Sequence, residues 1–134
     1  IYAVDANTGA KLWEFETIRR DPASWPGDSA RTGGGGAWMP GQYDPKLGLY
    51  FVGTSNAAPD FDGSKRRGDN LYTATVLAIE PRSGQLRWHH QEVPHDVWDY
   101  DSAYEALLIP RAGRQMMVHL NKGGHVTVLD SASG

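Results

Sequence analysis

Short segments rich in apolar residues, separated by polar turn residues, are the main pattern along the chain. Eight such segments contain Val, Leu, Tyr and Trp and are bounded by Gly, Pro, Asn or Asp, the composition and punctuation of β-strands. The predicted strands are Ile1–Asp5, Lys11–Thr17, Leu49–Ser55, Ala74–Glu80, Gln85–Val93, Glu105–Pro110, Gln115–Asn121 and His125–Asp130. No long segment has helical periodicity, so the pattern predicts an all-β protein.

One phrase recurs within this pattern. It reads AVDANTGAKLW from Ala3 to Trp13 and AIEPRSGQLRW from Ala78 to Trp88, and Val128–Gly134 begins it a third time. Self-similarity indicates a repeat architecture, and short strands joined by Gly turns favour a β-propeller over a helical solenoid. We interpret Trp13 and Trp88 as structural, because a repeated indole can dock between neighbouring blades while its N–H bonds a backbone acceptor.

Length and composition limit the possibilities further. The 134 residues supply about two to three four-stranded blades, and the chain begins and ends within copies of the repeat, so we expect a partial propeller from a longer protein. The net charge of −3 argues against a nucleic-acid partner. No segment reaches the roughly 18 apolar residues that span a bilayer. The absence of Cys excludes a disulfide or a Cys–Zn site within this segment.

A glycine run stands outside the repeat. Gly33–Pro45 reads GGGGAWMPGQYDP, in which four glycines leave the backbone unobstructed and Trp38 follows almost at once. A flat conjugated ligand needs this combination of a stacking ring and closely approaching backbone. A flexible loop that ends at a core Trp explains the same residues.

Other polar side chains could form a site. Asn56 follows a strand, and its amide oxygen suits a hard cation such as Ca²⁺, although Asn is also a common turn former. In PHDVWDYD, Asp99 and Asp101 would lie on one face of an extended segment, where paired carboxylates can chelate a cation or supply a general base. A solvated acidic turn is the alternative. Lys122 precedes a glycine turn, where a lone Lys is normally solvent-exposed, and becomes significant only if it faces a carboxylate and an anionic ligand.

Several of these motifs occur in one order along the chain: AxDxxTGxxxW, SWPGDS, GGGGAW, GTSNAAP, GDNLYT, PHDVWDYD and NKGG. In this the chain resembles the quinoprotein alcohol dehydrogenases of the methanol and ethanol type. The resemblance implies an eight-bladed propeller with tryptophan-docking motifs that uses pyrroloquinoline quinone (PQQ) and a metal ion. Residues 1–134 would then be part of a single PQQ-binding β-propeller domain.

The resemblance also implies a role for each candidate residue. Trp38 would stack on the quinone ring system, and Lys122 would bond a reactive quinone carbonyl and the base. Asn56 would give its side-chain oxygen to the metal, and Asp99 would be the catalytic base beside the same ion. Asp101 matches an additional carboxylate of lanthanide-using members, so the expected cofactors are PQQ with Ca²⁺ or a lanthanide ion.

The implied reaction is oxidation of a primary alcohol to an aldehyde by hydride transfer to metal-bound PQQ. The partners would be a small alcohol and a cytochrome c as electron acceptor, which implies a periplasmic location. Two alternatives stay open: a non-catalytic propeller scaffold of outer-membrane assembly, which shares the repeat phrase, and a calcium-dependent propeller hydrolase that uses Asn56, Asp99 and Asp101.

Overall fold

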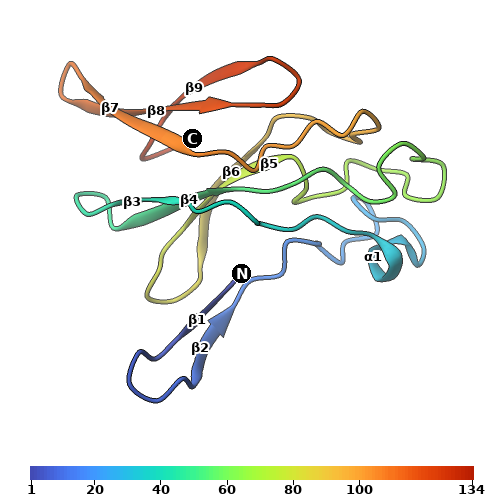
Figure 1. Cartoon of the computed structure of the whole chain (residues 1–134), viewed down its shortest axis with the longest axis horizontal. Coiled ribbons are helices and arrows are strands. Elements are labelled where there is room, and N and C mark those ends of the chain that lie inside the picture. Colours follow the sequence, from blue (N-terminus) through green and yellow to red (C-terminus); the bar gives the residue numbers. More distant parts are fainter.

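Three antiparallel sheets make up the computed structural model, which describes residues 1–134 (Figure 1). The two-stranded sheet contains β1 (Tyr2–Val4) and β2 (Lys11–Glu14). The four-stranded sheet contains β3 (Gln42–Asp44), β4 (Leu49–Gly53), β5 (Thr75–Ile79) and β6 (Leu86–Gln91). The three-stranded sheet contains β7 (Ala106–Arg111), β8 (Arg114–Leu120) and β9 (Val126–Asp130). One complete four-stranded sheet between parts of two others confirms the all-β, partial-propeller prediction.

Two elements escaped the sequence analysis. Strand β3 has only three residues between Gly41 and Pro45, and it forms by pairing with β4, for example Tyr43 with Tyr50. A three-residue strand has no readable alternation, so its partner determines it. The helix α1 (Ser29–Thr32) lies in the long polar connection before β3. No helix of the chain has the length and apolar character needed to cross a bilayer.

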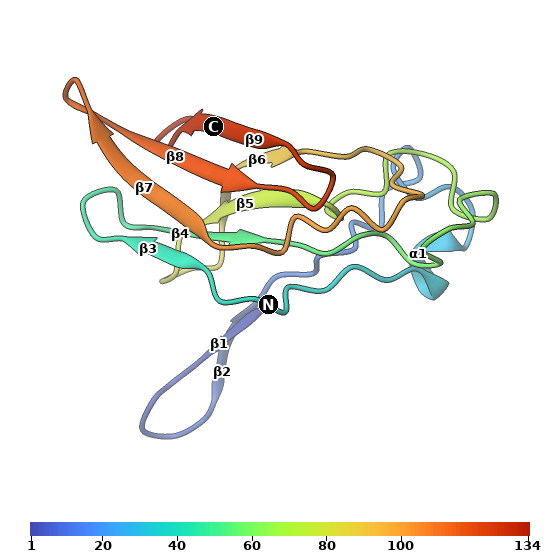
Figure 2. The same ribbon diagram turned by 45° about the horizontal axis from the view of Figure 1, so that its top comes forward.

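The hydrophobic core lies on both faces of the central sheet. On one face, Phe51 and Val76 pack in a cluster with Met117 of β8. On the other face, Val52 and Leu77 pack with partly buried side chains from the first sheet, including Trp13. All five residues of β5 are therefore buried, which explains its continuous apolar sequence. The central sheet thus lies between its two neighbours (Figure 2).

The repeated tryptophans join consecutive sheets, as predicted. Trp13 Nε1 donates to Pro81 O at 2.9 Å, and Trp88 Nε1 donates to Ser131 O at 3.2 Å. A Cβ at Gly84 would lie 2.6 Å from the Trp13 ring, so only glycine fits where the turn approaches the indole most closely. Each indole therefore docks on the turn of the next repeat copy.

The long connections gather at one end of the sheets, together with α1 and the β8–β9 turn (Figure 1). They comprise residues 15–41, 54–74 and 92–105. They are packed against one another: Trp25 is 1% exposed, and its Nε1 donates to Leu71 O at 2.6 Å. All five candidate site residues lie in these connections or in the β8–β9 turn.

Candidate functional site

Two of the candidate carboxylates lie against the ammonium group of a third candidate residue. Lys122 Nζ lies 2.6 Å from Asp99 Oδ2 and 3.4 Å from Asp101 Oδ2. The Lys122 side chain is 41% exposed, whereas that of Asp101 is only 12% exposed. The hydrogen bond to Asp99, with a further contribution from Asp101, holds the pKa of Lys122 above its ordinary value. Lys122 is therefore a cation that faces two carboxylates, which meets the carboxylate part of the sequence expectation.

A buried carboxylate fixes the backbone around Asp99. Asp96 is fully buried and accepts the backbone N–H groups of Trp98 at 2.8 Å and Tyr100 at 2.7 Å. Between these two bonds Asp99 has a φ of 64°, in the left-handed region that non-glycine residues rarely adopt. The expectation of an extended segment was therefore wrong, but the side chains of Asp99 and Asp101 still meet at Lys122. Such a conformation persists where its surroundings impose it.

The β8–β9 turn is tied to the acidic segment by a residue that the sequence analysis missed. Asn121 is 5% exposed, and its Nδ2 donates to Ser102 Oγ at 2.8 Å and to Asp101 O at 3.1 Å. The backbone N–H of Lys122 also donates to Asp101 O at 3.0 Å. The only sequence signal for Asn121 is its place at the end of a strand, directly before Lys122.

Asn56 reaches the same cluster through its backbone. Its N–H donates to Asp101 Oδ1 at 3.0 Å, while its side-chain Nδ2 donates to Asp60 Oδ1 at 2.8 Å and to Ala57 O at 3.3 Å. No hydrogen bond of the structure ends on Asn56 Oδ1. The amide oxygen is therefore free to coordinate a cation.

The glycine run lies alongside the segment that carries Asn56. Ser55 N donates to Gly36 O at 2.7 Å, Gly36 N donates to Ser55 Oγ at 2.8 Å, and Gly34 forms a bridge with Ala58. A Cβ at Gly34 would lie 2.9 Å from that of Ala58, so the close approach requires glycine. Trp38, two residues beyond, is 59% exposed and so does not pack in the core formed by residues 1–134. Its ring makes no aromatic or hydrogen-bonded contact with the other four candidates.

The donor set fits part of a cation site. No group of three or more His, Cys, Asp or Glu side chains in the chain could hold a metal. Asp99, Asp101 and Asn56 offer only oxygen atoms, which suit Ca²⁺ and other hard cations. Because such ions take about 6–8 oxygen ligands, the remaining donors have to come from groups outside this set. These residues thus fit part of the coordination sphere of an oxygen-ligated ion, and other groups have to supply the remaining ligands.

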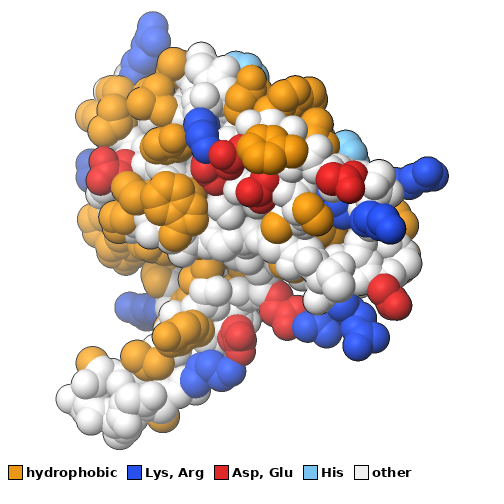
Figure 3. All heavy atoms as spheres, turned by 45° about the vertical axis from the view of Figure 1, so that its right-hand side comes forward, with side chains coloured by type: hydrophobic (Ala, Val, Ile, Leu, Met, Phe, Trp, Pro, Cys, Tyr) orange, Lys and Arg blue, Asp and Glu red, His pale blue; other side chains and the backbone are white.

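Aromatic side chains flank the acidic group. The rings of Trp98 and Tyr100 stack with centroids 5.8 Å apart and an interplanar angle of 22°. Trp98 is 57% exposed, so apolar surface remains accessible on one side of Asp99. In Figure 3, acidic and basic side chains lie side by side with hydrophobic side chains around them. The surroundings of Asp99 therefore combine charge with apolar surface.

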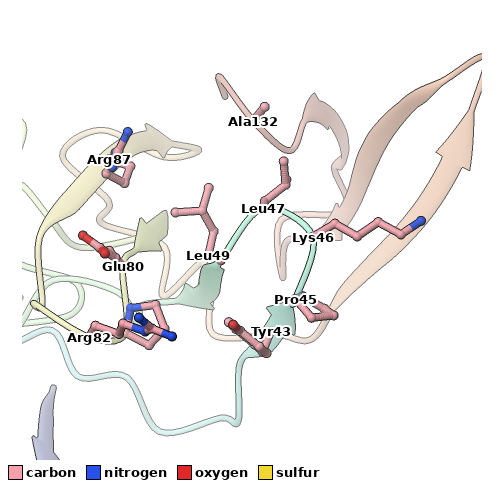
Figure 4. A pocket seen from close by; sticks show the side chains of 11 residues that line it. Tyr43, Pro45, Lys46, Leu47, Leu49, Glu80, Arg82, Arg87 and Ala132 are labelled. Carbon is pink, nitrogen blue, oxygen red and sulfur yellow. The ribbon is translucent and has the colours of Figure 1, made fainter.

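A separate hollow of about 490 Å³ lies among the turns at the other end of the sheets (Figure 4). It is lined by residues of the β3–β4 and β5–β6 turns, among them Lys46, Glu80 and Arg82. None of the five candidate residues lines it. Its size alone therefore does not make it the reaction site.

Comparison with known proteins places these residues in context. The model of the glucose/ethanol/alcohol dehydrogenase family, PQQ β-propeller domain, matches residues 1–134. A quinohemoprotein alcohol dehydrogenase, ADH IIB, of Pseudomonas putida is 36% identical over the whole chain, which covers 22% of that relative. A lanthanide-dependent methanol dehydrogenase of Methylorubrum extorquens is also 36% identical over the whole chain, which covers 26% of it.

Solved structures agree with these relatives. The quinohemoprotein alcohol dehydrogenase of Comamonas testosteroni superposes with a TM-score of 0.88 at 33% identity, over 99% of this chain and 23% of that one. A europium-containing methanol dehydrogenase gives a TM-score of 0.87 at 32% identity, over 99% of this chain and 28% of that one. The chain thus spans about a quarter of the length of the proteins that it matches.

Proposed function

The chain belongs to the PQQ-dependent glucose/ethanol/alcohol dehydrogenase β-propeller family, and on that premise we propose that its protein oxidises a primary alcohol to an aldehyde. The observation that carries the proposal is the convergence of Asp99, Asp101 and Lys122, with the backbone N–H of Asn56 bonded to Asp101 and the Asn56 amide oxygen left without a hydrogen bond. Residues 1–134 are proposed to be part of a single PQQ-binding propeller domain. The exposed ring of Trp38, two residues after Gly36, which bonds Ser55 next to Asn56, is the proposed stacking surface for PQQ.

Asp99 is the proposed general base. When bound, PQQ and its metal ion supply the electrophilic carbonyl that accepts the hydride. Asp99 takes the hydroxyl proton as the hydride leaves the alcohol carbon. The alcohol thus loses one proton and one hydride and becomes an aldehyde. A positioned base of this kind is worth about 10²–10⁴ in rate. Lys122 donates to Asp99, and its positive charge would stabilise negative charge on the quinone oxygen.

Asp101 supports a lanthanide as the metal. It adds a second carboxylate to the site, and a trivalent ion prefers more anionic oxygen ligands. Among the relatives, the names of a methanol dehydrogenase and of a solved structure record a lanthanide or europium. We therefore propose La³⁺-type activation over Ca²⁺. Equal or better turnover with Ca²⁺ would contradict this assignment.

The electrons are proposed to pass to a cytochrome c in the periplasm. The support is the haem in the names of the quinohemoprotein relatives. A spectrum of the reduced acceptor after addition of enzyme and alcohol tests this step.

The decisive experiment uses the full-length protein, reconstituted with PQQ and either La³⁺ or Ca²⁺ and assayed with a primary alcohol and an acceptor dye. Dye reduction that needs alcohol, PQQ and metal together supports the proposal. A scaffold protein would show no cofactor absorbance, and a hydrolase would turn over ester or phosphoester substrates without an acceptor. Either result would overturn the dehydrogenase assignment.

A further inference from the structure

A buried arginine lies beneath the candidate site. Arg66 is 1% exposed, and every oxygen to which its guanidinium donates belongs to a backbone carbonyl or to an amide side chain. Its Nη1 donates to Asn70 Oδ1 at 2.8 Å, and its Nε donates to Pro59 O at 3.0 Å. A buried cation without a directly bonded carboxylate is uncommon, because its desolvation must be offset by hydrogen bonds alone. The hydrogen bonds of Arg66 therefore have to offset the cost of burying its charge.

The first arm from Arg66 leads to Asn56. Arg66 Nη2 donates to Pro59 O at 2.9 Å and to Asp60 O at 3.3 Å, which fixes the backbone of this loop. The carboxylate of Asp60 in turn accepts Asn56 Nδ2 at 2.8 Å. Because Asp60 accepts a hydrogen bond from Nδ2, the orientation of the Asn56 amide is fixed, and its Oδ1 is left without a hydrogen bond. Arg66 thus acts on Asn56 through Asp60.

The second arm leads to Asp99. Arg66 Nη2 also donates to the backbone carbonyl of Asp96. The carboxylate of Asp96 holds the N–H groups on both sides of Asp99, whose left-handed φ depends on these bonds. Residues 59–60 and 96 are far apart in the chain, and Arg66 Nη2 contacts both segments.

We propose that Arg66 is the positioning residue that couples the Asn56 and Asp99 arms, so that the metal-binding amide and the catalytic base hold one fixed separation. The proposal rests on the proposed function, because the separation matters only if both groups serve the same ion and substrate. Lysine cannot replace Arg66, since its ammonium has three donors on a compact head and cannot span carbonyls from two loops and an amide.

The test compares Arg66→Lys with the matched control Arg67→Lys in the full-length protein, because Arg67 is the exposed neighbour. Amide hydrogen exchange is measured on the apo protein. Arg66→Lys is expected to raise exchange in residues 56–60 and in residues 96–101 together, while β4–β6 remain protected. Asp60→Asn is expected to raise it only in the first segment and Asp96→Asn only in the second. Arg67→Lys is expected to change neither.

Metal affinity is the second readout. La³⁺ titration of the PQQ-loaded protein is expected to show affinity lowered about 10–100-fold by Arg66→Lys, the usual effect of losing a residue that orients metal ligands, and unchanged by Arg67→Lys. Unchanged exchange in both segments, or loosening spread evenly over β4–β6, would overturn the coupling. If Arg66→Lys does not fold, the segment-specific patterns of Asp60→Asn and Asp96→Asn decide. Absence of alcohol oxidation by the wild type would remove the proposed function and leave the exchange result standing.

Discussion

Lys122 Nζ lies 2.6 Å from Asp99 Oδ2 although 23 positions separate the two residues in the chain. The contact joins the β8–β9 turn to the long connection between β6 and β7. Asp101 shares the same ammonium at 3.4 Å. This arrangement gives a base, a cation and a second carboxylate in one place, and most of the predictions below test one member of it.

Replacing Asp99 with Asn removes the proposed base and preserves its shape. We expect kcat to fall by about 10²–10⁴, because proton abstraction loses its acceptor. PQQ should still bind, as judged by cofactor absorbance after gel filtration. Retained turnover would remove Asp99 from the role of base.

Replacing Lys122 with Met removes the cation beside Asp99. We expect kcat to fall at least about tenfold, as for other lost electrostatic contacts, and Lys122→Arg to keep most of the rate because it can still donate to both carboxylates. Assays with saturating alcohol and PQQ measure both variants.

The pH dependence of this pair has a defined sign. The pKa of Lys122 is raised above its ordinary value of 10.5, so the side chain stays protonated at every pH below that value and its contribution is lost only as the pH rises through the higher folded pKa. The rate ratio of wild type to Lys122→Met should therefore stay constant from about pH 7 to pH 9. A ratio that falls steadily over this range would contradict the assignment.

Replacing Asp101 with Asn removes one negative charge and keeps an acceptor for the Asn56 N–H. We expect La³⁺ affinity to fall at least about tenfold and Ca²⁺ affinity to fall less, since the trivalent ion depends more on anionic oxygen. Metal titrations of the PQQ-loaded protein measure both constants. Asp62→Asn, an exposed acid of the neighbouring loop, is the control. Equal losses for the two ions would count against a lanthanide role for Asp101.

Gly53 allows β4 to approach the acidic segment closely. A Cβ at this position would lie 1.7 Å from Ser102 O, a backbone atom, so Gly53→Ala must displace the residue next to Asp101. We expect a loss of roughly 1–3 kcal/mol in stability, the usual cost of overpacking. Gly36→Ala is the control, because a Cβ there meets no atom within 4 Å. Melting temperatures of the two variants should differ clearly; the same temperature for both would show that the segment yields easily.

Glu92 and His119 form a buried pair behind the site. His119 Nδ1 lies 3.2 Å from each Glu92 oxygen, and both side chains are 1% exposed. Burial raises the pKa of Glu92, but the hydrogen bond and electrostatic interaction with His119, together with hydrogen bonds from Ser102 and Thr127, outweigh it and hold the pKa below its ordinary value. A carboxylate with a lowered pKa stabilises the fold above its unfolded pKa and loses that contribution as the pH falls through the folded value.

Glu92→Gln should therefore be less stable than wild type at neutral pH, by roughly 1.5–3 kcal/mol for a hydrogen bond to a charged group. The difference in melting temperature should be full at pH 6–7 and should shrink below about pH 4.5, the ordinary Glu value. His119→Gln, which removes the other partner, should show the same trend. A difference that persists unchanged at pH 3.5 would mean that ionised Glu92 is not its source.

Most of the strand framework follows from local sequence. The apolar run of β5 and the recurring turn predict strands because these depend on neighbours a few residues away, and the recurrence of the phrase predicts that each Trp docks on the next copy, which lies 68 positions along the chain for Trp13 and Pro81. Strand β3 could not be predicted from the sequence, because its three residues between Gly41 and Pro45 are too few to show an alternation of apolar and polar side chains. The alternation rule also failed for Asp99, whose left-handed backbone depends on Asp96.

The sequence by itself determined the strand-and-turn repeat and, through the motifs, the residue types available for chemistry. Only the tertiary structure decided that Asp99, Asp101 and Lys122 meet, that Asn56 keeps its oxygen free, and that Arg66 joins their loops. The physical reason is distance along the chain. A repeat phrase is specified by adjacent residues, whereas a cluster drawn from several connections exists only after the packed sheets bring those connections to the same end.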